Sequence, residues 1–299
     1  MNAINTRTLQ TIETPGLLAN SRKVSNLDDH LYHSDLHIQS CSMLKGMLES
    51  PGHYQSALTA RRVASKSMDF GTLVHLLVLE PHQLLSKAAI FPGANPTAAE
   101  SREFNAAHKG MMVFDEPTFH MAEIARDKLL GQRVLGRLFG DFVAEGEPEA
   151  SIYYTDPDTG VECRTRQDLR HPEAIFDVKT TTYAHTREWV RHALSLHYDM
   201  QAYMYSLADC LYSGIENPRP FVFMTVENAY PLSTGARRAG VNFMVAGSRK
   251  YKHAITSYAA CARADYWPCP GGEEVIDINT WESEFDTSWL VAQPVQVAP

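Results

Sequence analysis

The sequence predicts a mixed α/β fold, in which a central, mostly antiparallel or mixed sheet is flanked by helices. Three observations support this. Residues 150–181 contain three short alternating segments that are separated by turn signals. Helical spacing of apolar residues comes before them, near 40–50, 70–81 and 115–140. It returns after them at 185–196 and 199–214, followed by a strand at 219–227 and a long helix over 236–266.

The β part consists of strands that follow one another closely. The segment 150–154 reads ASIYY, and the turn 156–160, DPDTG, follows it directly. The alternating segment 161–169 is the expected returning strand, and His171-Pro172-Glu173 makes a second turn before a third strand at 174–181. These connections are short enough to pair neighbouring strands as hairpins.

The regions outside the sheet define the expected domain organisation. Residues 1–29 are mostly polar and lack sustained periodicity, which predicts an N-terminal tail. Residues 30–268 are expected to form one domain that begins with a helical region, and 269–299 are expected to form a C-terminal tail. A chain of 299 residues is long enough to bury a sizeable core.

Composition limits the possible classes of protein. No run approaches the length of a membrane span and the N-terminus has no apolar signal segment, so we expect a cytoplasmic protein. The five cysteines are scattered, which argues against a disulfide framework or a cysteine metal site. The net charge of -8 is unusual for a nucleic-acid binder, but binding depends on the local field, and carboxylates that hold metal ions add negative charge.

Three charged residues are expected to converge on the sheet. Asp177 and Lys179 are two apart on one predicted strand, so their side chains point to the same face, with Val178 buried behind them. Asp168 lies near the end of the preceding strand, and the hairpin brings it alongside. Carboxylates, together with water and phosphate oxygens, are the ligands that magnesium prefers. A nearby lysine can orient the attacking water or neutralise charge on the phosphate. The alternative is a solvated strand face with a salt bridge.

These residues resemble the signature of the PD-(D/E)xK nuclease superfamily. The matching segments are Arg166-Gln167-Asp168 and Phe176-Asp177-Val178-Lys179-Thr180-Thr181. More narrowly, the chain is similar to the RecE (exonuclease VIII) and RecB-like branch, which includes phage-type recombination exonucleases. The resemblance covers roughly residues 30–268, from Ser42-Met43-Leu44-Lys45 to Tyr266-Trp267-Pro268. It implies a restriction-endonuclease-like core.

The resemblance also implies further metal ligands. His75, in Gly71-Thr72-Leu73-Val74-His75, matches a helix histidine that binds metal in those nucleases. By residue type alone, a single histidine amid leucines is more often a core residue than a metal ligand. Glu149 matches an acidic position before the first aspartate, although Glu145 or Glu147 could take this place. Val178 is expected to offer its backbone carbonyl. The implied cofactor is magnesium, for which manganese can substitute, and manganese accepts imidazole more readily.

Two residues on the next helix complete the resemblance. Gln201 and Tyr205 match a Q-x-x-x-Y motif and lie one helical turn apart on one face. The resemblance implies that they face the catalytic site, whereas packing on the sheet is the alternative for Tyr205. Arg164 and Arg166 share a strand face with Asp168, so each is a candidate contact to a DNA phosphate.

The resemblance implies an exonuclease that acts on the ends of double-stranded DNA. Such enzymes degrade the 5′-ended strand and leave a 3′ tail for a RecT-like single-strand annealing protein, and a ring-shaped homo-oligomer is also implied. Two alternatives remain open. One is a single-strand or structure-specific nuclease of the same superfamily. The other is an inactive nuclease-like module that binds DNA or protein.

Overall fold

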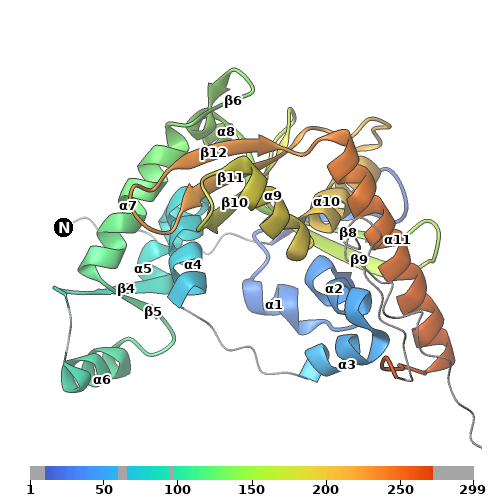
Figure 1. Ribbon diagram of the computed structural model, residues 1–299, viewed down its shortest axis with the longest axis horizontal. Helices are drawn as coiled ribbons and strands as arrows, with labels where there is room; N and C mark the ends of the chain where they lie inside the picture. The colour runs from blue at the N-terminus through green and yellow to red at the C-terminus, as the bar shows by residue number, and fades with distance from the viewer. Residues whose placement is uncertain (1–10, 60–65, 95–96, 272–299) are drawn as a thin grey trace, which may run out of the picture. The chain divides into compact units, whose positions relative to one another are not determined.

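The computed structural model describes residues 11–59, 66–94 and 97–271 (Figure 1). The chain divides into two units, Met1–Pro268 and Cys269–Pro299. Most of the second unit, and with it most of the expected C-terminal tail, lies outside the described residues. The fold and the site described below belong to the first unit.

An eight-stranded sheet forms the centre of this unit. Seven strands follow one another across it in the order β1-β2-β8-β9-β10-β11-β12. Neighbours are antiparallel except for β10 and β11, and short β3 pairs in parallel with β9. The sheet confirms the predicted fold class. The strands are β1 Ile12–Pro15, β2 Arg22–Ser25, β3 Gln39–Ser40, β8 Glu147–Thr155, β9 Glu162–Arg170, β10 Ile175–Thr181, β11 Phe221–Glu227 and β12 Thr234–Arg238.

Helices precede and follow the central strands, as expected. A 3-10 turn at Pro81–Gln83 and two small strand pairs lie among the N-terminal helices: β4 Ala88–Phe91 with β5 Met112–Asp115, and β6 Arg133–Val134 with β7 Arg137–Leu138. The helices are α1 Asp29–Ser34, α2 Cys41–Glu49, α3 Pro51–Thr59, α4 Lys66–Leu79, α5 Leu84–Lys87, α6 Ala98–Ala107, α7 Glu116–Leu130, α8 Phe139–Glu145, α9 Thr186–Ser195, α10 Tyr198–Ser213 and α11 Val241–Ala264.

The prediction of an N-terminal tail over residues 1–29 is wrong for its described part. Strand β2 pairs antiparallel with β8, and β1 pairs with β2 at the edge of the sheet. Only Val24 of these strands is buried among apolar residues, so hydrophobic alternation gives no signal. Backbone hydrogen bonds to an existing sheet edge hold this segment in place. Likewise, residues 236–238 of the expected long helix extend the sheet as part of β12.

The two faces of β10 explain how the site is placed. Phe176 and Val178 point into an apolar cluster formed with α4, α7 and α8. Ile175 points to the other face, where it packs with Trp189 of α9 and Ala202 of α10. Figure 1 shows α4 and α7 on one side of β10 and β11, with α9 and α10 on the other. Because side chains alternate along a strand, Asp177 and Lys179 face α9 and α10.

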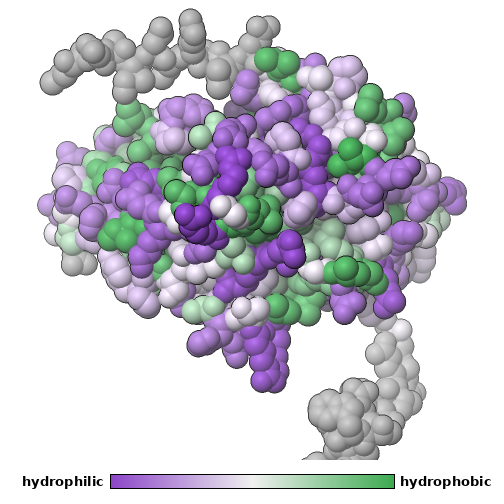
Figure 2. All heavy atoms as spheres, turned by 90° about the horizontal axis from the view of Figure 1, so that it is seen from above, coloured by the Kyte–Doolittle hydropathy of each residue, from purple (hydrophilic) through white to green (hydrophobic). Residues whose placement is uncertain are grey.

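Among the described residues, no helix is both long and apolar enough to span a bilayer. On the face shown in Figure 2, hydrophobic residues form separate patches between hydrophilic ones. The five cysteines all have free thiols.

Candidate active site

Strand β10 supplies the centre of the site. Asp177 is fully buried, and its Oδ2 lies 2.5 Å from Nζ of Lys179 on the same face of the strand. Val178 between them is buried on the opposite face, as predicted. The side-chain amide of Gln201, on α10, donates to Oδ1 of Asp177 at 2.6 Å. Both oxygens of this buried carboxylate therefore have a partner from the chain itself.

Strand β9 places the first aspartate beside this pair. Strands β9 and β10 are paired at Arg170–Ile175 and Leu169–Phe176, next to the turn. At the following position the backbone N–H of Val178 donates to Oδ2 of Asp168 at 2.7 Å. The carboxylate thus takes a bond that the strand ladder would otherwise make. Asp168 is fixed at the point where the two strands separate.

Helix α4 carries His75 to the same carboxylate. Nε2 of His75 lies 2.6 Å from Oδ2 of Asp168, and Nδ1 lies 3.3 Å from Oε1 of Glu149. Gly71, one turn earlier, permits this approach: a Cβ there would lie only 3.0 Å from Oγ1 of Thr180 on β10. The sequence left open whether His75 is a core histidine. The structure places it against two carboxylates.

Glu149 is the acidic residue of β8 that reaches the site. Its register on β8 places it opposite Asp168, between the pairs Pro148–Leu169 and Ala150–Gln167. Its backbone has a φ of 52°, a left-handed conformation that a non-glycine residue in a strand adopts at some cost. This turns its side chain toward His75.

The two other glutamates considered for this position point elsewhere. Glu145 pairs with Arg137 at 2.6 Å, and Glu147 pairs with Lys23. Arg137 lies on β7 and Lys23 on β2. Among the described residues, the carboxylates paired with His75 are those of Glu149 and Asp168. Of the three candidates, the geometry favours Glu149.

The residues present fit a divalent cation. His75, Glu149 and Asp168 each offer a ligand atom, and these atoms lie within 4.8 Å of one another. Two carboxylates and one imidazole suit manganese and, with water in the remaining positions, magnesium. Asp177 lies outside this group because Lys179 and Gln201 hold its oxygens. A metal that also used Asp177 would compete with the lysine ammonium.

The protonation of the metal-free site follows from burial and neighbouring charge. Burial, and secondly the charge of Asp168, raise the pKa of Asp177 to about 6. Burial would also raise the pKa of Asp168, but His75 and Lys179 outweigh it and hold that pKa below its usual value. The pKa of His75 is raised well above normal because Asp168 and Glu149 outweigh its desolvation. To serve as a ligand, His75 would therefore have to give up a proton.

Lys179 remains an ammonium in this setting. Burial would lower the pKa of Lys179, but the carboxylates of Asp177 and Asp168 raise it above its ordinary value. The side chain is therefore a cation held beside the carboxylates rather than a free base. In the metal-free state, this ammonium neutralises part of the negative charge of Asp177 and Asp168.

Tyr205 lies one helical turn beyond Gln201 and is half buried. Its backbone carbonyl accepts from the side chain of Gln167, and its ring packs against Phe221 at 6.3 Å between centroids. Burial raises the pKa of its phenol well above normal. The ring of Tyr205 therefore packs on the sheet, against β11. A catalytic role for Tyr205 stays a prediction. The carbonyl of Val178 as a metal ligand also stays a prediction.

The structure corrects the expected DNA contact at Arg164. This residue is 1% exposed, and its guanidinium lies 5.0 Å from the centroid of the Tyr32 ring on α1. No phosphate can reach it in this conformation. Arg164 does lie on the same strand face as Arg166, as predicted, but α1 covers that face at Arg164.

Arg166 lies beside the same tyrosine ring, at 4.0 Å, and is nearer to solvent. It donates to Asp29 at 3.1 Å, to the carbonyl of Leu27 at 3.1 Å and to Ser151 at 3.0 Å. Asp29 is largely exposed, so this ion pair is weak and exchangeable. A phosphate contact at Arg166 stays a prediction, and it would require displacement of Asp29.

The structure adds two residues to the surroundings of the site. Nζ of Lys179 lies 5.2 Å from the centroid of the Tyr198 ring, and Nζ of Lys45 lies 5.4 Å from the same centroid. Tyr198 begins α10, and Lys45 is on α2. Lys45 belongs to the segment that carries the family resemblance, but its spacing gives no sign of this approach.

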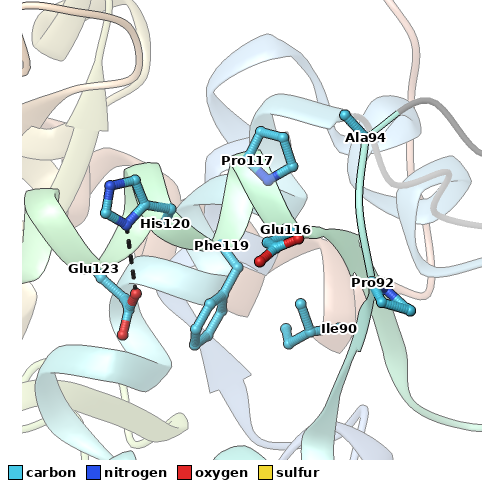
Figure 3. A pocket seen from close by; sticks show the side chains of 8 residues that line it. All are labelled: Ile90, Pro92, Ala94, Glu116, Pro117, Phe119, His120 and Glu123. Atoms are coloured by element: carbon cyan, nitrogen blue, oxygen red, sulfur yellow. Dashed lines mark ion pairs between the residues drawn. The ribbon is translucent and has the colours of Figure 1, made fainter.

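A hollow of about 740 Å³ lies away from this chemistry (Figure 3). The ion pair drawn there joins His120 and Glu123 on α7, at 3.8 Å, and both side chains are partly exposed. None of the site residues lines the hollow. The residues that line it are Ile90, Pro92, Ala94, Glu116, Pro117, Phe119, His120 and Glu123. Phosphodiester chemistry is supported by the carboxylate cluster instead.

Comparison with solved structures finds chains that are similar to this one. A solved structure from Eubacterium rectale, titled "Putative exonuclease", has a TM-score of 0.53 and 14% identity, covering 87% of this chain and 99% of its own. At that identity the match shows a shared fold. The structure of SSO0001 has a TM-score of 0.28 and 11% identity, covering 73% of this chain and 85% of its own. A search of curated proteins finds no match.

The sequence itself matches a family model over residues 40–277, a range that includes every residue of the site described above. The description of that family is "PDDEXK-like domain of unknown function (DUF3799)". The chain therefore belongs to this PDDEXK-like family, which confirms the resemblance to the PD-(D/E)xK superfamily.

Proposed function

We propose that this protein is a divalent-metal-dependent nuclease that degrades linear double-stranded DNA from its ends. One observation carries the proposal: Asp168, Asp177 and Lys179 meet at the divergence of β9 and β10, with His75 and Glu149 in contact with Asp168 or with each other. An isolated surface salt bridge would need neither the histidine nor the left-handed Glu149. A preference for duplex ends and 5′ to 3′ polarity rest on the resemblance to RecE.

The roles of the residues follow from their contacts. His75, Glu149 and Asp168 would hold the cation, which would activate the attacking water and neutralise charge on the phosphate. Gln201 fixes the orientation of Asp177 through its hydrogen bond. Lys179 presents an ammonium next to both aspartates, where it can stabilise negative charge that develops on the phosphate.

The direct test uses linear and circular plasmid with magnesium, manganese or EDTA. Loss of the linear form alone, and only with metal, supports the exonuclease. Loss of both forms indicates an endonuclease, and loss of neither indicates a binding module. Duplexes with one blocked 5′ or 3′ end, labelled at the other, then give the polarity. Degradation that starts at a blocked 5′ end would contradict the proposed direction.

Replacement of His75 by alanine should produce a defect that depends on the metal. The two carboxylates remain, but one ligand and one fixed partner of Asp168 are lost. We expect activity in magnesium to fall at least about a hundredfold, the upper end of the roughly 10–100-fold loss typical for residues that only orient a metal ligand, with partial recovery in manganese. The measurement is the initial rate in each metal. An equal loss in both metals with a lower melting temperature would indicate a core histidine.

The proposed partners extend beyond DNA. The resemblance to RecE favours a homo-oligomeric ring that encloses the duplex and supplies 3′ tails to a RecT-like annealing protein. Enclosure would also explain how a chain of charge -8 retains DNA. We expect enzyme bound to labelled duplex in EDTA to continue degradation after magnesium and excess competitor are added together. Arrest soon after this addition would contradict a ring.

A further inference from the structure

The aromatic ring of Tyr198 is fixed beside the site by other rings. It stacks on Phe223 of β11, with centroids 5.9 Å apart and planes at 24°. Trp189 of α9 lies 6.5 Å away in the same cluster. Tyr198 is also the first residue of α10, and His197 before it has a left-handed backbone with φ of 55°. The face of this ring is therefore a fixed platform.

Two ammonium groups lie against that platform. Lys179 reaches it from β10 and Lys45 from α2, at 5.2 and 5.4 Å from the centroid. Both distances are within the range in which a cation is attracted by an aromatic ring. The two ammonium groups therefore lie no farther apart than the sum of these distances. The ring holds Lys45 in a fixed relation to the catalytic lysine.

The two lysines differ in their anionic partners. Lys179 is ion-paired with Asp177. Among the described residues, the lysines with a carboxylate within 4.0 Å are Lys23, Lys87, Lys179 and Lys250, and Lys45 is not one of them. Lys45 is half buried, so its ammonium is only partly solvated. A partly desolvated cation without an anion, next to a phosphodiesterase site, is complementary to a phosphate of the substrate.

We propose that Lys45 binds a backbone phosphate of the nucleic acid next to the scissile one, and that Tyr198 is a positioning residue that aligns Lys45 with Lys179. The inference rests on the proposed nuclease function and names a substrate contact for it. Lys45 here takes the role first expected of Arg164, which α1 buries.

The test compares Lys45→Met, Lys45→Arg and Lys252→Met, the last being a control because Lys252 is exposed on α11. Binding of a labelled duplex in EDTA is measured by fluorescence anisotropy over a series of salt concentrations. Lys45→Met should weaken binding about tenfold at low salt. The slope of log affinity against log salt should fall by about 0.9, as expected for one lost phosphate contact. Lys45→Arg should restore both, and Lys252→Met should change neither.

The kinetics of DNA cleavage in the presence of a divalent metal distinguish the role of Lys45 from that of Tyr198. Lys45→Met should raise KM for duplex DNA and leave kcat nearly unchanged. Tyr198→Leu removes the platform of both lysines and should affect kcat and KM together, whereas Tyr198→Phe keeps the ring and should behave like the wild type. Melting temperatures check that each variant is folded.

The outcomes distinguish this inference from the proposed function. If wild-type protein cuts no DNA with any divalent metal, the proposed function fails. If the wild type cuts DNA but Lys45→Met matches Lys252→Met in affinity and salt slope, the phosphate contact at Lys45 is overturned. Equal kinetics for Tyr198→Leu and Tyr198→Phe would overturn the positioning role.

Discussion

Replacement of Asp177 by asparagine is expected to reduce cleavage of linear duplex about a thousandfold, the upper range for loss of one preorganised group in a catalytic site. Asparagine keeps the shape and can still accept the hydrogen bond from Gln201. It removes the charge that attracts the cation and that pairs with Lys179. The local structure should survive while the electrostatics of the site are lost.

Asp209 provides a matched control for this substitution. It is also a fully buried aspartate, paired with Arg170 at 2.8 Å and with Arg219, and lies further along α10. Asp209→Asn should lower the melting temperature because it leaves two arginines short of a partner, but it should retain cleavage. If folded Asp177→Asn cuts near the wild-type rate, or Asp209→Asn loses activity without loss of stability, the assignment of the site to β10 is wrong.

Local spacing was enough to predict the centre of the site. Asp177 and Lys179 meet because alternation on a strand is fixed, and a short turn at 171–173 returns Asp168 to their side. The contact of His75 with this centre depends on how α4 crosses β10, which periodicity alone does not determine. The prediction that His75 belongs to the site came from the resemblance to the PD-(D/E)xK nucleases.

Tertiary contacts explain what the sequence could not predict. Strands β1 and β2 are mostly polar and are held by backbone pairing, so they have no hydrophobic pattern. Arg164 has the alternation of a surface residue, but α1, distant in sequence, covers it with Tyr32. The meeting of Lys45 and Tyr198 joins segments that are about 150 residues apart, and nothing local to either segment indicates it.

Removal of Lys179 should separate catalysis from metal binding. Lys179→Ala deletes the ammonium that neutralises charge near the phosphate, and we expect activity to fall between about a hundredfold and a thousandfold, the range for loss of one preorganised charge-stabilising group. The metal ligands His75, Glu149 and Asp168 remain in place. Lys45 cannot replace the lost group if it already binds a neighbouring phosphate.

Metal affinity should be retained or increased in this variant. In the wild type, Lys179 and an incoming cation compete for Asp177, whose Oδ2 is 2.5 Å from the ammonium. Without the lysine, a bound metal would no longer compete with an ammonium for the carboxylate of Asp177. The charge of Lys179 also lowers the pKa of Asp177, which is about 6 with the lysine present, so its loss raises that pKa further. Manganese titration by calorimetry should therefore be carried out well above pH 6, where the proton does not compete. Loss of manganese binding together with activity would identify Lys179 as a structural residue, whereas loss of activity with undiminished binding would establish its action on the substrate phosphate.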